Sequence, residues 1–175
     1  MGKDVKVFIG IIGVSLALAL GFALWQGSGQ PEAGGGEVAS SITLTNISQL
    51  EAQPVNYDLG SVPINGGIVT KEYELKNNSE GTVKVGNIVT SCMCTEASIT
   101  VGDRQSKFFG MEHPGDRNPP LGYEINPGES AKVIVNFDPA AHGPQGTGPF
   151  DRVVTISFTQ PLGVKQLTFE GTVVK

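Results

Sequence analysis

The hydrophobic and polar positions divide the chain into two parts with different periods. Residues Val7 to Trp25 form a run of 19 without a charge and without a polar face. Beyond about residue 40 the apolar residues alternate with polar ones, a pattern typical of strands that bury one face. The sequence therefore predicts one apolar helix followed by a β domain.

The apolar run is long enough to span a bilayer. Lys3 and Lys6 precede it, whereas residues 26–70 contain no Lys or Arg. Because positive charge is retained on the cytoplasmic side, this asymmetry places the N-terminus in the cytoplasm and the rest of the chain outside. We expect a single-pass transmembrane segment at the cell membrane, with the body of the chain extracytoplasmic.

The apolar run also differs from a cleavable signal peptide. It exceeds the apolar region of about 7–15 residues found in such peptides, and it ends at Leu24-Trp25-Gln26 without a small-x-small cleavage site. We therefore predict an uncleaved signal-anchor. Cleavage after Gly27 or Gly29 is the alternative.

Composition sets the domain count. The stretch after the anchor is rich in Gly, Ser and Glu and has no apolar period, which predicts a flexible linker. A chain of 175 residues then leaves room for about one domain. The predicted organisation is a cytoplasmic tip at residues 1–6, a transmembrane anchor at 7–25, a linker at 26–40 and an extracytoplasmic domain at 41–175.

Short alternating segments predict the strands of this domain, with Gly, Pro and Asn turns between them. Gly86-Asn87 breaks the phase of one segment in the manner of a β-bulge. Residues 102–122 and 140–149 lack any period, and the first stretch is long enough to indicate a functional loop. The seven to eight segments predict an all-β, immunoglobulin-like β-sandwich. They lie near 41–46, 54–59, 69–76, 83–89, 99–101, 133–137, 154–158 and 167–173.

Charge and motif content exclude several classes of function. The net charge is -5, and the 12 basic residues form no cluster, so the sequence predicts no nucleic-acid binding. No Gly-rich phosphate loop follows a strand into a helix, and no Ser, His and carboxylate set stands out. We therefore expect no enzymatic activity.

The two cysteines of the chain, Cys92 and Cys94, lie in the segment Ser91–Thr95. On a regular strand their Cα atoms would be about 6.6 Å apart, which is too wide for an unstrained bridge. A disulfide between them therefore requires a turn or bulge. In an oxidising compartment two thiols so close would oxidise, pair with a partner or bind a metal.

Other soft ligands occur in the two irregular stretches. Thiolate, thioether and imidazole together suit copper, especially Cu(I). Zinc accepts the Cys and His subset of these ligands. The order of these residues does not match that of the cupredoxins, which argues against an electron-transfer copper site. The candidate metal ligands are Cys92, Cys94, Met111, His113 and His142.

Two other interpretations of the same residues stay open. The cysteines suit a structural role as small apolar residues at a strand end, with Met111 as core filler and the histidines as loop residues. The Cys pair also suits a redox or mixed-disulfide role. The spacing alone brings neither histidine to a thiol, so it predicts no Cys–His catalytic pair.

Three segments carry a resemblance to a known family. They are Val55–Val62, Val89–Thr95 with its two cysteines, and Ile125–Glu129 followed by Val133–Phe137. Together they resemble a bacterial family of uncharacterised extracytoplasmic domains, related to the Hydin-type and major-sperm-protein-type immunoglobulin-like sandwiches. That family carries a Ser-Cys-Gly-Cys-Thr motif and a Pro-Gly-Glu turn. Here Met93 replaces the glycine of the motif, and the insertion at Phe108–Pro120 is longer than expected.

These observations lead to two hypotheses about function. The first is a non-enzymatic, membrane-anchored module that recognises another cell-envelope protein through loops or a strand edge. The second is a copper- or zinc-binding protein that uses the Cys-x-Cys with the Met and His residues. The sequence assigns no partner by name and no oligomeric state.

Overall fold

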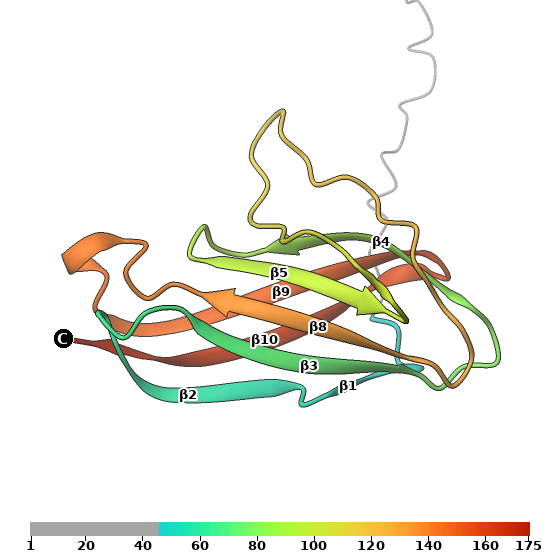
Figure 1. Cartoon of the computed structure of the whole chain (residues 1–175), viewed down its shortest axis with the longest axis horizontal. Coiled ribbons are helices and arrows are strands. Elements are labelled where there is room, and N and C mark those ends of the chain that lie inside the picture. The colour runs from blue at the N-terminus through green and yellow to red at the C-terminus, as the bar shows by residue number, and fades with distance from the viewer. Residues whose placement is uncertain (1–45) are drawn as a thin grey trace, which may run out of the picture. The chain divides into compact units, whose positions relative to one another are not determined.

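The computed structural model describes residues 46–175, which form two packed β-sheets (Figure 1). The predicted anchor and linker, and all of the predicted strand 41–46 except Asn46, lie outside the described residues. Residues 46–175 contain no helix long and apolar enough to cross a membrane. The elements are β1 (Leu50–Gln53), β2 (Asn56–Pro63), β3 (Val69–Asn77), β4 (Val83–Thr90), β5 (Thr95–Val101), β6 (Arg104–Gln105), β7 (Glu124–Ile125), β8 (Ser130–Phe137), the 3-10 helix η1 (Gly143–Gln145), β9 (Gly148–Gln160) and β10 (Leu162–Val174).

The order of the strands defines the architecture. One sheet has the order β1-β3-β8-β5-β6, and the other has the order β2-β10-β9-β4-β7. Neighbours are antiparallel except for β2 and β10, which are parallel. The longer strands match the A-B-E-D and G-F-C sheets of an immunoglobulin sandwich, with the first strand divided between the sheets as β1 and β2. This confirms the predicted all-β sandwich.

The strand count is higher than predicted, because ten strands are present in the described part of the chain. Two of them, β6 and β7, have only two residues each. The sequence pattern missed β1, where only Leu50 and Ala52 are buried and the polar residues around them give no clear period. Conversely, β9 and β10 extend well beyond the predicted segments, with 13 residues each.

The predicted bulge is present in β4. Val85 pairs with Phe158 and Ile88 pairs with Ile156, so two residues of β4 lie opposite the single residue Ser157. A side chain at position 86 would crowd Ser157, because its Cβ atom would lie 2.6 Å from the hydroxyl oxygen and 3.2 Å from the carbonyl oxygen of that residue. The bulge increases the local twist of β4 on its way to the cysteines.

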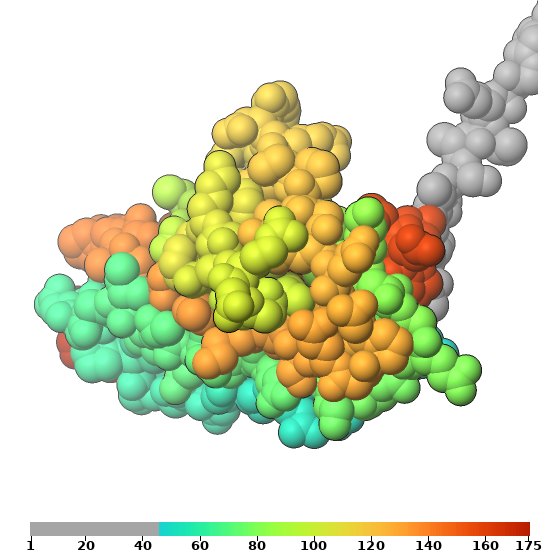
Figure 2. All heavy atoms as spheres, turned by 45° about the vertical axis from the view of Figure 1, so that its right-hand side comes forward, coloured from blue at the N-terminus to red at the C-terminus, as the bar shows by residue number. Residues whose placement is uncertain are grey.

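The insertion between β5 and β8 closes one side of the sandwich. Phe109 exchanges two backbone hydrogen bonds with Ala97 of β5, at 2.9 and 2.8 Å. Further along, the amide of Leu121 donates to the carbonyl of Gly86 in β4, at 2.6 Å. The insertion therefore joins the exposed edges of both sheets, and Figure 2 shows its middle part as a lobe that stands above them. Closed edges protect the sheets from pairing with other chains.

The core lies between the sheets, and Tyr73 crosses it. Tyr73 of β3 is fully buried, and its hydroxyl donates a 2.7 Å hydrogen bond to the carbonyl of Thr168 in β10. Burial raises the pKa of Tyr73, so the hydroxyl stays a neutral donor. This bond connects the two sheets directly. Its ring also contacts that of Tyr57 edge to face, with centroids 5.0 Å apart.

We predict that Tyr73→Phe lowers the free energy of unfolding by about 1 kcal/mol, because it removes one buried hydrogen bond and little volume. Tyr123→Phe is the control, since the Tyr123 hydroxyl makes no hydrogen bond among residues 46–175 and its loss is expected to be near neutral. Urea unfolding followed by fluorescence measures both variants. Equal effects of the two substitutions would show that the bond between the sheets contributes nothing.

Candidate functional site

The β4–β5 connection is a tight turn that brings the two cysteines together. The amide of Thr95 donates to the carbonyl of Cys92, at 3.1 Å, which closes a four-residue turn. The Cα atoms of Cys92 and Cys94 are 5.3 Å apart, closer than a regular strand allows, and their sulfur atoms form a disulfide. The predicted requirement for a turn is confirmed.

Buried backbone and side-chain contacts fix this turn on both sides. The hydroxyl of Thr90, which is buried, lies 3.0 Å from the carbonyl of Cys92 and 2.9 Å from that of Thr95. On the other side, the carbonyl of Cys94 accepts a 2.9 Å hydrogen bond from the amide of Asp138. The turn is therefore attached to both the β4 end and the β8–β9 connection.

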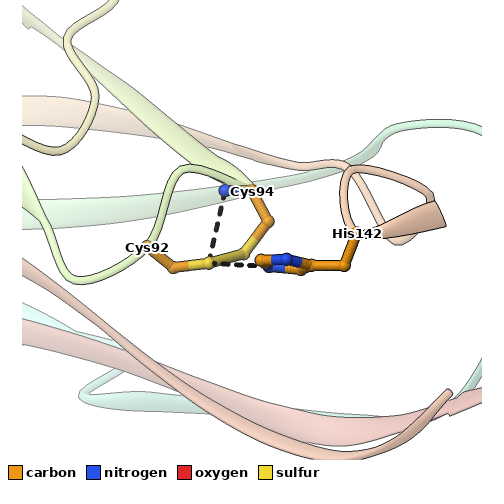
Figure 3. A group of neighbouring side chains, drawn as sticks. All are labelled: Cys92, Cys94 and His142. Atoms are coloured by element: carbon orange, nitrogen blue, oxygen red, sulfur yellow. Dashed lines mark hydrogen bonds between the residues drawn. A yellow bond between two sulfur atoms is a disulfide. The ribbon is translucent and has the colours of Figure 1, made fainter. Parts of the chain in front are cut away.

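His142 reaches the disulfide from the β8–β9 connection, as Figure 3 shows. Its Nε2 atom lies 3.3 Å from the Cys92 sulfur. The carboxylate of Asp138 accepts from the amide of Ala140, at 2.8 Å, and Gly143 adopts a φ of +68°, which favours glycine. A Cβ atom at Gly146 would lie 2.9 Å from the Cβ of His142. Local turns therefore hold the exposed imidazole in place.

Arg152 of β9 reaches the other sulfur. Its Nε atom donates to the Cys94 sulfur at 3.1 Å, and its guanidinium carbon lies 5.7 Å from the centroid of the Phe150 ring. The ion pairs in residues 46–175 are Lys84–Glu124 and Lys132–Glu72, so no carboxylate of the described part neutralises Arg152. A half-buried positive charge therefore lies directly against the Cys94 sulfur.

The two sulfur atoms have different surroundings. Cys94 is only 3% exposed, whereas Cys92 is half-buried and reachable from solvent. The Cys92 sulfur accepts a 3.3 Å hydrogen bond from the amide of Cys94 in addition to its contact with His142. One sulfur is thus accessible, and the other is buried beside a cation.

The structure brings together three of the five predicted metal ligands. The sulfur atoms of Cys92 and Cys94 and a ring nitrogen of His142 lie within 4.8 Å of one another. His113 is not in this group and lies in a turn of the insertion, where its backbone exchanges hydrogen bonds with Asp116. Met111 is half-buried in the insertion, next to Gly110.

Two large apolar side chains are exposed at this end of the sandwich. Ile68, in the β2–β3 connection, is 62% exposed, and Met93, between the cysteines, is 65% exposed. Both line a surface hollow of about 320 Å³, together with the buried Cys94. The other residues around the hollow are Thr95, Glu96, Gly110, Asn136 and Asp138.

Comparisons with known proteins give structural matches alone. No protein-family model matches the sequence, and the search of curated proteins gives no match. A protein of unknown function from Porphyromonas gingivalis W83 is similar in structure, with 16% sequence identity and a TM-score of 0.51. The match covers 75% of this chain and 50% of that one, so the chain spans about half the length of this protein.

Two further matches have lower TM-scores. The ASH/PapD-like domain 7 of human CEP192 is 14% identical over 83% of this chain and 99% of that one, with a TM-score of 0.43. WR4, a C. elegans member of the MSP family, is 9% identical over 73% of this chain and 100% of that one, with a TM-score of 0.40. The class that the fold and site define is an immunoglobulin-like β-sandwich with a Cys-x-Cys disulfide at one end. The likeness to the family with the Ser-Cys-Gly-Cys-Thr motif stays a prediction.

Arg152 is not among the residues predicted from the sequence, although its position in the β9 pattern sets it apart. In β9 the buried residues Phe150, Val154, Ile156 and Phe158 alternate, and Arg152 falls in the same inward phase. A charged residue at an inward position needs a partner. The sequence could not predict which residue of β9 lies beside the cysteines, because this depends on the register between β4 and β9.

We predict that thiol titration of the full-length chain, unfolded after purification without reductant, detects no free thiol and finds two after reduction, because both cysteines are in the disulfide. The control is Cys92→Ser, which leaves one thiol that titrates without reduction. Two free thiols in the wild type before reduction would contradict the bridge.

Proposed function

We propose that this chain is a non-enzymatic, membrane-tethered interaction domain, held on the outer side of the membrane, that binds another protein of the cell envelope. The uncharged run at Val7–Trp25 and the basic residues before it support the tether and the orientation. The immunoglobulin-like sandwich supports a binding role, because such folds present loops at their ends for recognition.

The observation that carries the proposal is the apolar pair at the disulfide end. Ile68 and Met93 come from different connections, line the same hollow and remain mostly exposed, which is unusual for large apolar side chains on one small surface. Glu96 and Asp138 add negative charge at the margin of the hollow. This surface fits an apolar anchor residue of a protein partner with polar or basic residues around it.

We predict that Ile68→Ser weakens binding of the partner about tenfold, since it removes an apolar side chain worth about 1.5–3 kcal/mol when buried. The matched control is Leu162→Ser, because Leu162 is 59% exposed at the start of β10 and does not line the hollow. Quantitative capture of envelope proteins by the full-length chain from solubilised membranes compares the two variants. Equal recovery with both, or no specific partner with the wild type, counts against the proposal.

Metal binding is the second candidate function, and the Cys92, Cys94 and His142 group is the observation that favours it. After reduction of the disulfide, two thiolates and one imidazole would suit Cu(I) or zinc. The guanidinium of Arg152 beside Cys94 opposes a second cation at the same place, so we rank this function below the first.

If the reduced chain takes up copper or zinc, we predict that His142→Ala weakens binding and that His113→Ala does not, because only His142 lies beside the sulfur atoms. Competition with a chromogenic chelator under anaerobic conditions measures both variants. Equal loss with the two substitutions would contradict a site built on the β4–β5 turn.

A further inference from the structure

We infer that the Cys92–Cys94 pair is a redox site that accepts electrons from a protein dithiol by thiol–disulfide exchange. This goes beyond the proposed interaction function, because it adds a covalent step at the same end of the domain. Three features of the described residues carry the inference: the short loop that the disulfide closes, the unequal access to its sulfur atoms, and the cation beside the buried one.

The first feature is the length of the loop. A disulfide stabilises a fold mainly by limiting the unfolded chain, and this effect grows with the length of the closed loop. On that model, closing about three residues contributes about half as much as closing fifteen residues. The turn is also held by Thr90 and by the amide of Asp138. The bridge therefore adds little to a turn that other contacts already fix.

The second feature decides where an incoming thiolate attacks. Cys94 is 3% exposed, whereas Cys92 is half-buried and its sulfur contacts the exposed His142. Exchange requires access to the sulfur along the disulfide bond. Cys92 is therefore the sulfur that is attacked, and Cys94 is the leaving group.

The third feature favours that leaving group. When the disulfide opens, the departing sulfur becomes a thiolate, and exchange is faster when this thiolate is stabilised. Arg152 donates from Nε to the Cys94 sulfur at 3.1 Å, and no carboxylate in residues 46–175 neutralises it. Arg152 thus stabilises the negative charge that forms on Cys94, and it favours the reduced state of the pair.

The reaction balances as two exchanges. A partner thiolate attacks the Cys92 sulfur, the Cys92–Cys94 bond breaks, and its electron pair leaves on Cys94. The second thiolate of the partner then attacks the partner sulfur that is bonded to Cys92, and Cys92 is released as a thiolate. The amide of Cys94 and the ring of His142 contact the Cys92 sulfur. The partner dithiol is oxidised to a disulfide, the Cys92–Cys94 pair is reduced by two electrons, and the two partner protons pass to the released thiolates or to water.

The first test measures the equilibrium with glutathione. The full-length chain is equilibrated with buffers of stepped reduced and oxidised glutathione, quenched in acid and alkylated, and its thiols are counted by mass. We expect Arg152→Gln to lower the equilibrium constant for reduction about tenfold, since it removes a charge-assisted hydrogen bond to the Cys94 thiolate. Arg152→Lys keeps the charge and should shift it less. Arg104→Gln removes a charge in β6 and should leave it unchanged.

The second test identifies the reacting sulfur. Cys94→Ser leaves the accessible Cys92, which should form a mixed disulfide with oxidised glutathione at least about tenfold faster than Cys94 does in Cys92→Ser. An unchanged equilibrium in Arg152→Gln, or a faster reaction at Cys94, would overturn the inference. Circular dichroism of each oxidised or single-cysteine variant shows whether it is folded. If Arg152→Gln does not fold, Arg152→Lys is measured in its place.

A third test separates this inference from the proposed interaction. In native membranes the Cys92 thiolate of Cys94→Ser should attack the disulfide of the oxidised partner and release one partner thiolate, which leaves covalent complexes with protein that are visible on non-reducing gels and absent from Cys92→Ser. Adducts with glutathione alone would overturn the assignment of a protein partner. Ile68→Ser should reduce these complexes yet leave the glutathione equilibrium unchanged. Loss of glutathione exchange therefore refutes the redox site, whereas complexes that persist in Ile68→Ser refute the docking surface.

Discussion

The antiparallel pairing of β4 with β9 is the constraint on which the site depends. It places Thr90 opposite Val154, and the pair of contacts between Ser91 and Val153 continues the pairing past the end of the strand. The chain then turns toward β5, and this turn places Cys94 beside the residue of β9 that lies two positions before Val154. That position is Arg152. A shift of register by one residue would turn Arg152 to the opposite face and leave Cys94 without a cation.

A cluster of three phenylalanines in the core packs beside this arrangement. Phe137, which ends β8, stacks on Phe150 at 4.5 Å between ring centroids, and both contact Phe169 of β10. Phe137 also pairs with Thr95, the first residue after the turn. The same cluster therefore fixes the start of β5 and the end of β8, and its Phe150 ring lies beside the guanidinium of Arg152. The buried Cys94 belongs to the core, whereas Cys92 and His142 are reachable from solvent.

The sequence predicted the sandwich because burial on one face of a strand leaves a local period that needs no tertiary information. Tyr73 and Leu75 in β3 and the alternating residues of β8 are examples. The bulge at Gly86-Asn87 was also predictable, since it breaks a period. The site was only partly predictable. The cysteines and His142 were identified by type, but which histidine meets the sulfur atoms depends on contacts between residues 50 positions apart.

Met111 and His113 show why residue type alone overestimates the site. Both lie in the insertion, whose ends are attached to β5 and β4 and whose middle stands away from the sheets (Figures 1 and 2). The insertion meets this end of the sandwich at Gly110, which lines the hollow beside Met93 and accepts a hydrogen bond from the amide of Thr90, while His113 lies outside the group around the sulfur atoms. The insertion protects the sheet edges, and the loops at the end of the sandwich carry the disulfide, His142 and the apolar pair. The hollow lined by Ile68 and Met93 also includes the buried Cys94, so the proposed docking surface adjoins the disulfide.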